Sequence, residues 1–257
     1  MTREEKISHL IAAIPELSDY RLALLQSMVR VFVQPWTVHR LPNSDIISES
    51  ALADFGDVLR IHHCFSREPF SKDKFEFALE AVLRASGVEA ELAPRGRRGY
   101  DIKVVGRNVS LKTEAAKAIR VDMIHISKFM ELGGGHWGDD PNDLIGLRQQ
   151  FLDNLAGIDR IFVLRALKKG EPDYLYELIE IPKDLLERAS EGRFEMRMES
   201  RQYPKPGYCF IEHEGNKLFS LYFDGGGERK LQIKSLGKEL CKVHASWRFD
   251  SPQQNQE

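Results

Sequence analysis

The sequence of 257 residues contains little cysteine, no long apolar run and almost no net charge. Its three cysteines, Cys64, Cys209 and Cys241, are an odd number at wide spacing, which argues against a disulfide framework or a zinc knuckle. No run approaches the ~18 apolar residues that a membrane helix needs. The charged start of the chain lacks the apolar core of a secretory signal. A net charge of −2 argues against a generic polyanion binder. These absences predict a cytoplasmic protein with no membrane partner.

Positive charge nevertheless collects in one region. Between residues 93 and 120 there are eight basic side chains and only two acidic ones, Asp101 and Glu114. A local basic field around a small carboxylate cluster suits a site that cleaves phosphodiesters. The alternative is a solvated loop in which arginines collect by chance. The eight basic residues are Arg95, Arg97, Arg98, Lys103, Arg107, Lys112, Lys117 and Arg120.

Apolar periodicity predicts a mixed α+β protein in three parts that form one compact domain overall. Residues 1–70 are expected to be largely helical, 71–190 to combine helices and strands, and 191–250 to form short antiparallel strands between turns. Residues 251–257 should be disordered. Helices are predicted at 4–34 with a break near Pro15, and at 51–58, 71–86, 143–156 and 182–189, and residues 115–132 are predicted to form a turn followed by a helix. Strands are predicted at 61–65, 100–105, 109–113, 158–166, 174–181, 194–198, 208–212, 218–223, 230–234 and 241–249.

The second and third of these strands should form a tight hairpin around a Gly-Arg-Asn turn at 106–108. Side chains alternate between the two faces of a strand. Ser110, Lys112 and Glu114 therefore share one face of the second strand, and Asp101 lies at the start of the first. The hairpin is expected to bring carboxylates and a lysine to one place.

Hydrolysis of a phosphodiester needs a water nucleophile and neutralisation of the charge that develops on the phosphate. Bound Mg²⁺ supplies both, and its usual ligands are one or two carboxylates together with phosphate oxygens and waters. A lysine beside the metal orients the water and stabilises negative charge. Asp101, Lys112 and a second carboxylate would meet these requirements.

Two glutamates could supply the second carboxylate. Glu114 shares a strand face with Lys112, but it could instead cap a helix that starts at Ala115 and be stabilised by the helix dipole. Glu76 lies on the helix that precedes the hairpin. Alternatively, Glu76 is simply exposed to solvent one turn from Glu80, as is usual for two glutamates on one side of a helix.

The adjacent residues His62, His63 and Cys64 invite interpretation as a metal site. Neighbouring side chains on a strand point to opposite faces, and no second pair of ligands follows at a matching spacing. We therefore interpret the three residues as structural.

The hairpin resembles the PD-(D/E)XK nuclease superfamily, in which an aspartate on one strand is followed on the next by an acidic residue, any residue and a lysine. The pattern stands here as Asp101, then Ser110-Leu111-Lys112. In the superfamily pattern a proline precedes the aspartate, and here Tyr100 stands in its place. Ser110 occupies the second acidic position, where its hydroxyl is a weaker metal ligand than a carboxylate. Blocks similar to a type II restriction endonuclease occur in the same order at residues 51–63, 111–117, 130–133, 180–183, 204–208, 220–226 and 228–234.

The resemblance implies a restriction-endonuclease-like core sheet flanked by helices, with catalysis in the second part of the chain and DNA recognition in the third. It implies a type II restriction endonuclease that uses Mg²⁺ to cut double-stranded DNA, as a homodimer at a palindromic GC-rich site. Carried over to this chain, Asp101 is a metal ligand and Lys112 orients the attacking water. Ser110 belongs to the same catalytic group, and Glu76 is preferred to Glu114 as the additional acid.

Charged side chains outside the hairpin are candidates for DNA contacts. In the major groove, Arg or Lys favours guanine, and Asp or Glu favours cytosine. The turns at 204–208 and 224–230 carry such residues, although they could simply be surface hairpins. Phosphate contacts are expected from Arg95, Arg97, Arg98 and Lys117. Base contacts are expected from Lys205, Asp224, Glu228, Arg229 and Lys230.

Two other functions remain open from the sequence. The same nuclease core could belong to a DNA repair or structure-specific endonuclease. Alternatively, the chain could be a sequence-specific DNA-binding protein without catalysis, in which the hairpin is structural and Asp101 pairs with an arginine.

Overall fold

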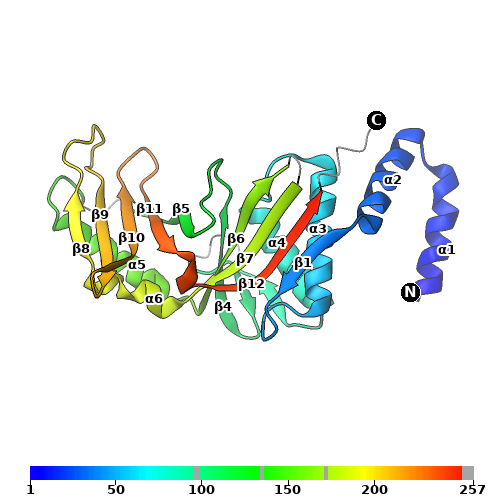
Figure 1. The fold of residues 1–257 in the computed structure, drawn as a ribbon, viewed down its shortest axis with the longest axis horizontal. Coiled ribbons are helices and arrows are strands. Elements are labelled where there is room, and N and C mark those ends of the chain that lie inside the picture. Colours follow the sequence, from blue (N-terminus) through cyan, green and yellow to red (C-terminus); the bar gives the residue numbers. More distant parts are fainter. Residues whose placement is uncertain (95, 97–98, 134–135, 171–172, 251–257) are drawn as a thin grey trace.

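The computed structural model describes residues 1–94, 96, 99–133, 136–170 and 173–250. Two sheets and their helices form an elongated molecule, with the larger sheet in the middle (Figure 1). The predicted α+β class is confirmed. The predicted phosphate contacts of Arg95, Arg97 and Arg98, and the predicted disorder of residues 251–257, lie outside the described residues. No helix in the described ranges is both long enough and apolar enough to cross a membrane.

The larger sheet has seven strands in the order β1-β12-β7-β6-β4-β3-β2. Strands β4 and β6 run parallel, and each other neighbouring pair is antiparallel. The sheet therefore places the predicted hairpin strands β3 and β4 beside the apolar strand β6. The strands are β1 (Trp36–Arg40), β2 (Ala90–Leu92), β3 (Ile102–Val104), β4 (Arg107–Glu114), β6 (Arg160–Lys169), β7 (Asp173–Ile181) and β12 (Lys242–Asp250).

The smaller sheet has five antiparallel strands in the order β5-β11-β10-β9-β8. Four of them come from the third part of the chain, where the short alternating runs and turns predict them. The last strand of the chain, β12, leaves this group and joins the larger sheet, so residues 191–250 do not form a single extension. The strands are β5 (Met123–Glu131), β8 (Arg193–Met196), β9 (Gly207–His213), β10 (Asn216–Asp224) and β11 (Lys230–Gly237), with η3 (Lys238–Leu240) before β12.

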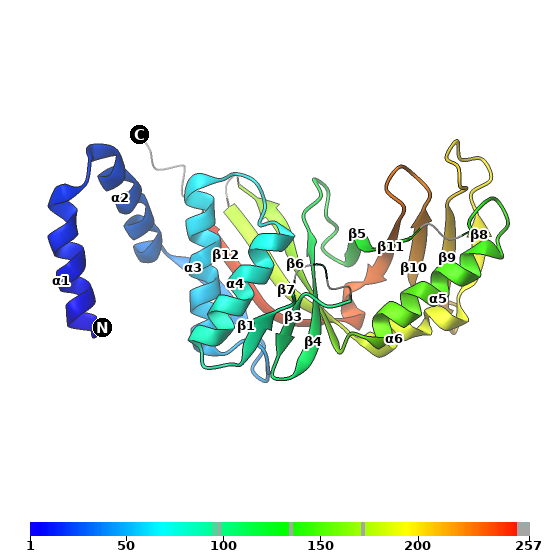
Figure 2. The ribbon, with the colours of Figure 1, turned by 180° about the vertical axis from the view of Figure 1, so that it is seen from behind.

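Helices α3 (Glu49–Phe65) and α4 (Lys72–Ala85) cover one face of the larger sheet (Figure 2). The apolar stripe of α4 and the aromatic side chains Phe55 and Trp247 pack in this core, and each large apolar side chain buried there contributes about 1.5–3 kcal/mol. The approach of α3 to the sheet is close, because a Cβ atom at Gly56 would lie 2.0 Å from the Trp36 ring.

A second core lies between the two sheets. Helices α5 (Asp143–Ala156) and α6 (Lys183–Glu187), with η2 (Arg188–Glu191), pack against the smaller sheet, and side chains of β6 and β7 join the same cluster. The larger sheet is thus buried on both faces along its central strands, which explains why β6 is a nearly continuous apolar run.

The first two helices are present as predicted, but their apolar faces are not buried. Helix α1 (Arg3–Ala13) contains no buried residue, and η1 (Ile14–Glu16) separates it from α2 (Asp19–Val33), which buries only Val31. These helices lie at one end of the molecule, away from the sheets (Figures 1 and 2). A capping box between Thr2 and Glu5 provides hydrogen-bond partners for backbone N–H groups at the start of α1, so this helix end needs no tertiary contact.

Helices α4 and α5 and strands β6 and β7 match their predictions within a few residues. The predicted helix at 115–132 is wrong, because Met123–Glu131 is a strand. Ile124 and Ile126 alternate as in a strand, but the pairing with β11 shifts register between them and again before Met130. This irregularity spaces the apolar residues like those of a helix.

The predicted strand at 61–65 is also wrong, because α3 continues through Phe65. The buried stripe of this helix includes Arg60 and His63, whose polarity conceals the helical period. His63 Nδ1 lies 2.9 Å from the Ser66 carbonyl oxygen, and Nε2 lies 2.8 Å from the Tyr176 hydroxyl. His63 is therefore a satisfied core side chain, which agrees with a structural role.

Acid should destabilise this part of the core. Burial lowers the pKa of His63 from 6.5 to about 4. Between these values the unfolded chain binds more protons than the folded one, so stability falls as pH drops through this window, by up to ~1.4 kcal/mol per pH unit. We expect His63→Gln to flatten this loss in urea unfolding between pH 6.5 and 4, whereas the exposed control His39→Gln keeps the wild-type slope. Equal slopes for His63→Gln and the wild type would contradict the prediction.

Candidate active site

The predicted hairpin exists, with a tighter turn than the sequence indicated. Strands β3 and β4 pair with Ile102 opposite Val109, and the turn is Val105-Gly106, with φ values of 46° and 75°. The sequence predicted the turn one residue later, at 106–108, and this prediction is wrong. Val105 did not indicate a turn, because a β-branched residue is rarely found at positive φ. Ile102 and Val109 pack into the core under α3 and α4.

Asp101 lies just before β3 and is held by the neighbouring strand. Its Oδ2 accepts hydrogen bonds from the Leu111 backbone N–H at 2.6 Å and from the Ser110 hydroxyl at 3.2 Å. Its side chain is 16% exposed, so the carboxylate has a fixed position at the edge of a solvent-accessible space. Ser110 thus positions Asp101 through a hydrogen bond.

Lys112 projects from the same face of β4. Its ammonium donates to the Ser110 hydroxyl at 2.8 Å and lies 3.7 Å from Asp101 Oδ2 and 5.3 Å from the centre of the Phe129 ring. Burial lowers the pKa of Lys112 to about 8, and the charge of Asp101 only partly offsets this effect. The lysine is therefore close to the pH range in which it can exchange a proton.

Helix α4 adds Lys72 and Glu76 to the cluster. The Lys72 ammonium lies 2.6 Å from Asp101 Oδ1 and 2.6 Å from Glu76 Oε1. Burial raises the pKa of Asp101, but Lys112 and Lys72 together lower it by more, so the net shift is downward and Asp101 is a carboxylate at neutral pH. The Lys72 ammonium thus bridges the carboxylates of Glu76 and Asp101. Sequence reasoning missed Lys72, although its spacing of four residues from Glu76 was visible.

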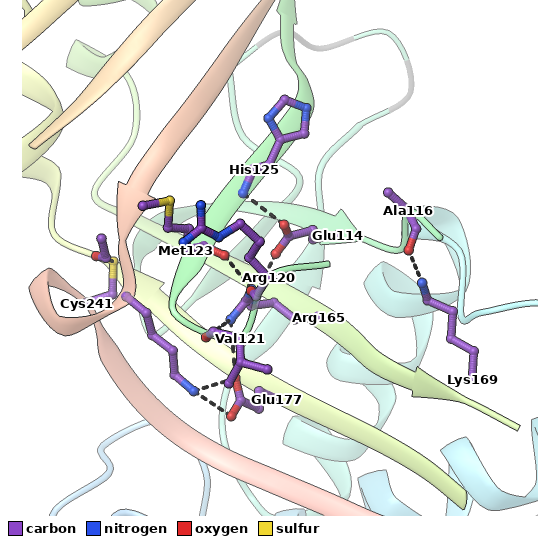
Figure 3. A network of polar contacts seen from close by, with 12 residues as sticks. Glu114, Ala116, Arg120, Val121, Met123, His125, Arg165, Lys169, Glu177 and Cys241 are labelled. Atoms are coloured by element: carbon purple, nitrogen blue, oxygen red, sulfur yellow. Dashed lines mark hydrogen bonds and ion pairs between the residues drawn. The ribbon is translucent and has the colours of Figure 1, made fainter. Parts of the chain in front are cut away.

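Glu114 belongs to a different cluster, which Figure 3 shows. One carboxylate oxygen accepts from Arg165 Nε, and the other accepts from the His125 backbone N–H at 2.9 Å. Arg165 is fully buried, and it also contacts Glu177 and donates to the backbone carbonyls of Arg120 and Met123. Since both oxygens of Glu114 are engaged, the expected placement of this residue beside Asp101 and the helix-cap alternative do not match the structure.

The carboxylates of Asp101 and Glu76 fit a magnesium ion. Among the described residues there is no group of three or more histidine, cysteine, aspartate or glutamate side chains that could hold a metal. Mg²⁺ does not need such a group, because it commonly takes one or two carboxylates and completes its shell with waters and phosphate oxygens. The donor set at this site is of that kind.

A groove with a volume of about 1670 Å³ opens in front of these side chains. Lys72, Asp101 and Lys112 line one side. Strand β5, the start of the following loop and α5 contribute further lining, and the turns before β9 and after β10 lie on the other side. The catalytic candidates and the predicted recognition turns therefore face one space.

Comparison with known proteins agrees with this arrangement. The family model of the SmaI type II site-specific deoxyribonucleases matches residues 10–249. The chain belongs to this family. The type II restriction enzyme SmaI of Serratia marcescens is 46% identical over 212 residues, which cover 82% of this chain and 84% of that enzyme. No solved structure matches the chain significantly.

Membership of the SmaI family confirms the resemblance to type II restriction endonucleases found in the sequence and makes the chain an enzyme of this type. The alternatives of a repair nuclease and a non-catalytic DNA-binding protein are accordingly set aside. The second alternative also required Asp101 to pair with an arginine, whereas its charged partners within 4 Å in the described residues are Lys72 and Lys112.

The structure separates the predicted DNA-contact residues of this SmaI-family chain into two groups. Glu228 and Arg229 line the groove, where Glu228 pairs with Lys128 and the Arg229 guanidinium lies 5.8 Å from the centre of the Trp137 ring. The other four residues do not line the groove. Asp224 accepts hydrogen bonds from Gly226, Gln202 and Gln232. The remaining three are Lys117, which is exposed, Lys205, which donates to the Ser200 carbonyl, and Lys230, which lies 3.6 Å from Glu228.

Proposed function

We propose that this restriction endonuclease hydrolyses duplex DNA with Mg²⁺ held by Asp101 and Glu76, and that Lys112 activates the attacking water. The observation that supports this proposal is that Asp101 and Lys112 lie together at one groove, with Glu76 linked to Asp101 through the Lys72 ammonium. When bound there, Mg²⁺ supplies Lewis-acid stabilisation of the phosphate charge and makes water a better nucleophile.

Each residue of the chain has a distinct task in this proposal. The Ser110 hydroxyl and Asp101 hold the Lys112 ammonium in place. A pKa of about 8 lets this amine take a proton from the attacking water or donate to the charged phosphate. Its side chain is only 10% exposed and lies beside the Phe129 ring, which limits its contact with bulk water. Asp101, with its lowered pKa, stays ionised throughout this cycle.

We propose that base recognition takes place on the opposite side of the groove. Arg229 suits guanine and Glu228 suits cytosine in the major groove, which supports a GC-rich site. The described part of one chain holds one Asp101–Lys112 centre, whereas a double-strand cut requires hydrolysis of two strands. A homodimer on a palindromic site supplies two centres. Sedimentation of the complex with a duplex oligonucleotide should show two chains per duplex, and a single bound chain would contradict the dimer.

Digestion of a sequenced plasmid tests the proposed function. With Mg²⁺ we expect discrete fragments whose ends map to one palindromic GC-rich sequence, and with a chelator we expect intact plasmid. Binding measured in Ca²⁺ should weaken by ~10³ or more over a fourfold rise in salt if several phosphates are held. Cutting at random positions, or cutting in the presence of a chelator, would contradict the proposal.

A further inference from the structure

The ammonium of Lys72 lies between the two carboxylates proposed as metal ligands. It is 2.6 Å from Asp101 Oδ1 and 2.6 Å from Glu76 Oε1. These contacts keep the two oxygens no more than about 5 Å apart, so one cation can lie between both carboxylates. In the metal-free enzyme, the Lys72 ammonium is that cation.

The second lysine of the cluster is held differently. Lys112 is only 10% exposed, donates to Ser110 and has its ammonium 5.3 Å from the centre of the Phe129 ring, so it is held more firmly in place. Lys72 has a side chain that is 39% exposed and lines the groove. It stands in the first turn of α4, and its long flexible stem can carry the charge elsewhere.

We propose that Lys72 is an internal counter-ion, which neutralises Asp101 and Glu76 in the metal-free enzyme and is displaced into the groove when Mg²⁺ binds. This inference rests on the proposed function, because it takes Asp101 and Glu76 as the metal ligands. It adds that the metal must compete with a cation that the chain itself provides.

The competition follows from distance and charge. A metal ion held by Asp101 and Glu76 would share both carboxylates with the Lys72 ammonium, and two cations held so close together would repel each other strongly. The ammonium must leave, so the metal-binding state is only a fraction of the metal-free population. The apparent affinity for the metal is reduced by that fraction. The displaced ammonium then faces the groove, where a DNA phosphate can replace the carboxylates as its partner.

Calorimetric titration with Mg²⁺, without DNA, tests this inference. We expect Lys72→Met to bind the metal roughly tenfold more tightly than the wild type, because the competing cation is gone. Lys72→Gln should behave like Lys72→Met, and Lys72→Arg should remain close to the wild type. Lys74→Met is the matched control, since it removes an exposed charge from the same turn of α4 and should leave the affinity unchanged.

Stability gives a second readout. In a chelator, Lys72→Met should melt below the wild type, because Asp101 and Glu76 then repel each other, and added Mg²⁺ should raise its melting temperature by more than it raises that of the wild type. Equal or weaker metal binding by Lys72→Met, or an equal tightening in Lys74→Met, would overturn the counter-ion role. Unchanged metal binding in Asp101→Asn would instead overturn the proposed metal site, so the two failures are distinguishable.

Discussion

Replacement of Asp101 by asparagine should reduce DNA cleavage by ~10³-fold or more while the protein stays folded. Loss of a metal ligand or its support costs ~10–100-fold, and loss of a group that stabilises transition-state charge costs ~10²–10³-fold. Asparagine has the same shape as aspartate, so it can still accept the hydrogen bond from the Leu111 backbone N–H. The expected defect is therefore in the chemical step.

Single-turnover cleavage of a duplex that contains the mapped site measures this effect, and binding of the same duplex in Ca²⁺ separates chemistry from DNA affinity. Asp153→Asn is the matched control, because Asp153 also lines the groove but lies on α5, outside the Asp101 cluster. It should cut at nearly the wild-type rate. Wild-type cleavage by Asp101→Asn, or equal losses in both variants, would show that Asp101 is not a catalytic residue.

Replacement of Arg165 by methionine should cost about 3–5 kcal/mol of unfolding free energy, which is the usual cost of breaking a buried ion pair. Arg165 has no exposed surface, and its removal leaves the Glu114 carboxylate buried without its cation. The carbonyls of Arg120 and Met123 also lose their donor. Urea unfolding at neutral pH measures the loss.

Two further variants make this prediction specific. Adding Glu114→Gln to Arg165→Met should recover part of the lost stability, because the uncompensated buried charge is removed. Arg248→Met breaks a pair with Asp173 in which the arginine is 55% exposed, so it should cost only ~1 kcal/mol or less. Similar losses in Arg165→Met and Arg248→Met, or no recovery in the double variant, would contradict the buried-charge explanation.

The sequence predicted the elements of this fold where one local signal dominates. The Ser71 start and the Gly87 stop of α4 agree with the structure, and Gly87 has a φ of 80°. The exposed apolar faces of α1 and α2 could not be foreseen, because periodicity shows which side chains share a face but not whether anything covers it. Sheet membership was equally hidden, since β12 has the same alternating pattern as the strands of the smaller sheet.

Only the part of the candidate site that lies on the hairpin could be predicted from the sequence. Alternation along β3 and β4 placed Asp101, Ser110 and Lys112 together, and the structure agrees. The role of Glu114 depended on the element next to it in the chain, and the wrong helix at 115–132 removed β5 from consideration. Its partner Arg165 lies on β6, 51 residues away, and only the parallel pairing of β4 with β6 brings the two together. Such pairings leave no local trace in a sequence.

The position of β12 has a consequence for the synthesis of the enzyme. This strand is the last element in the described residues, yet it lies between β1 and β7 and supplies the buried Trp247 against which α3 packs. A nascent chain that has not yet released these residues from the ribosome has an incomplete larger sheet and a core without its central aromatic side chain. Folding of the sheet that carries Lys112 must therefore wait until β12 has left the ribosome, although Lys112 is synthesised well before it.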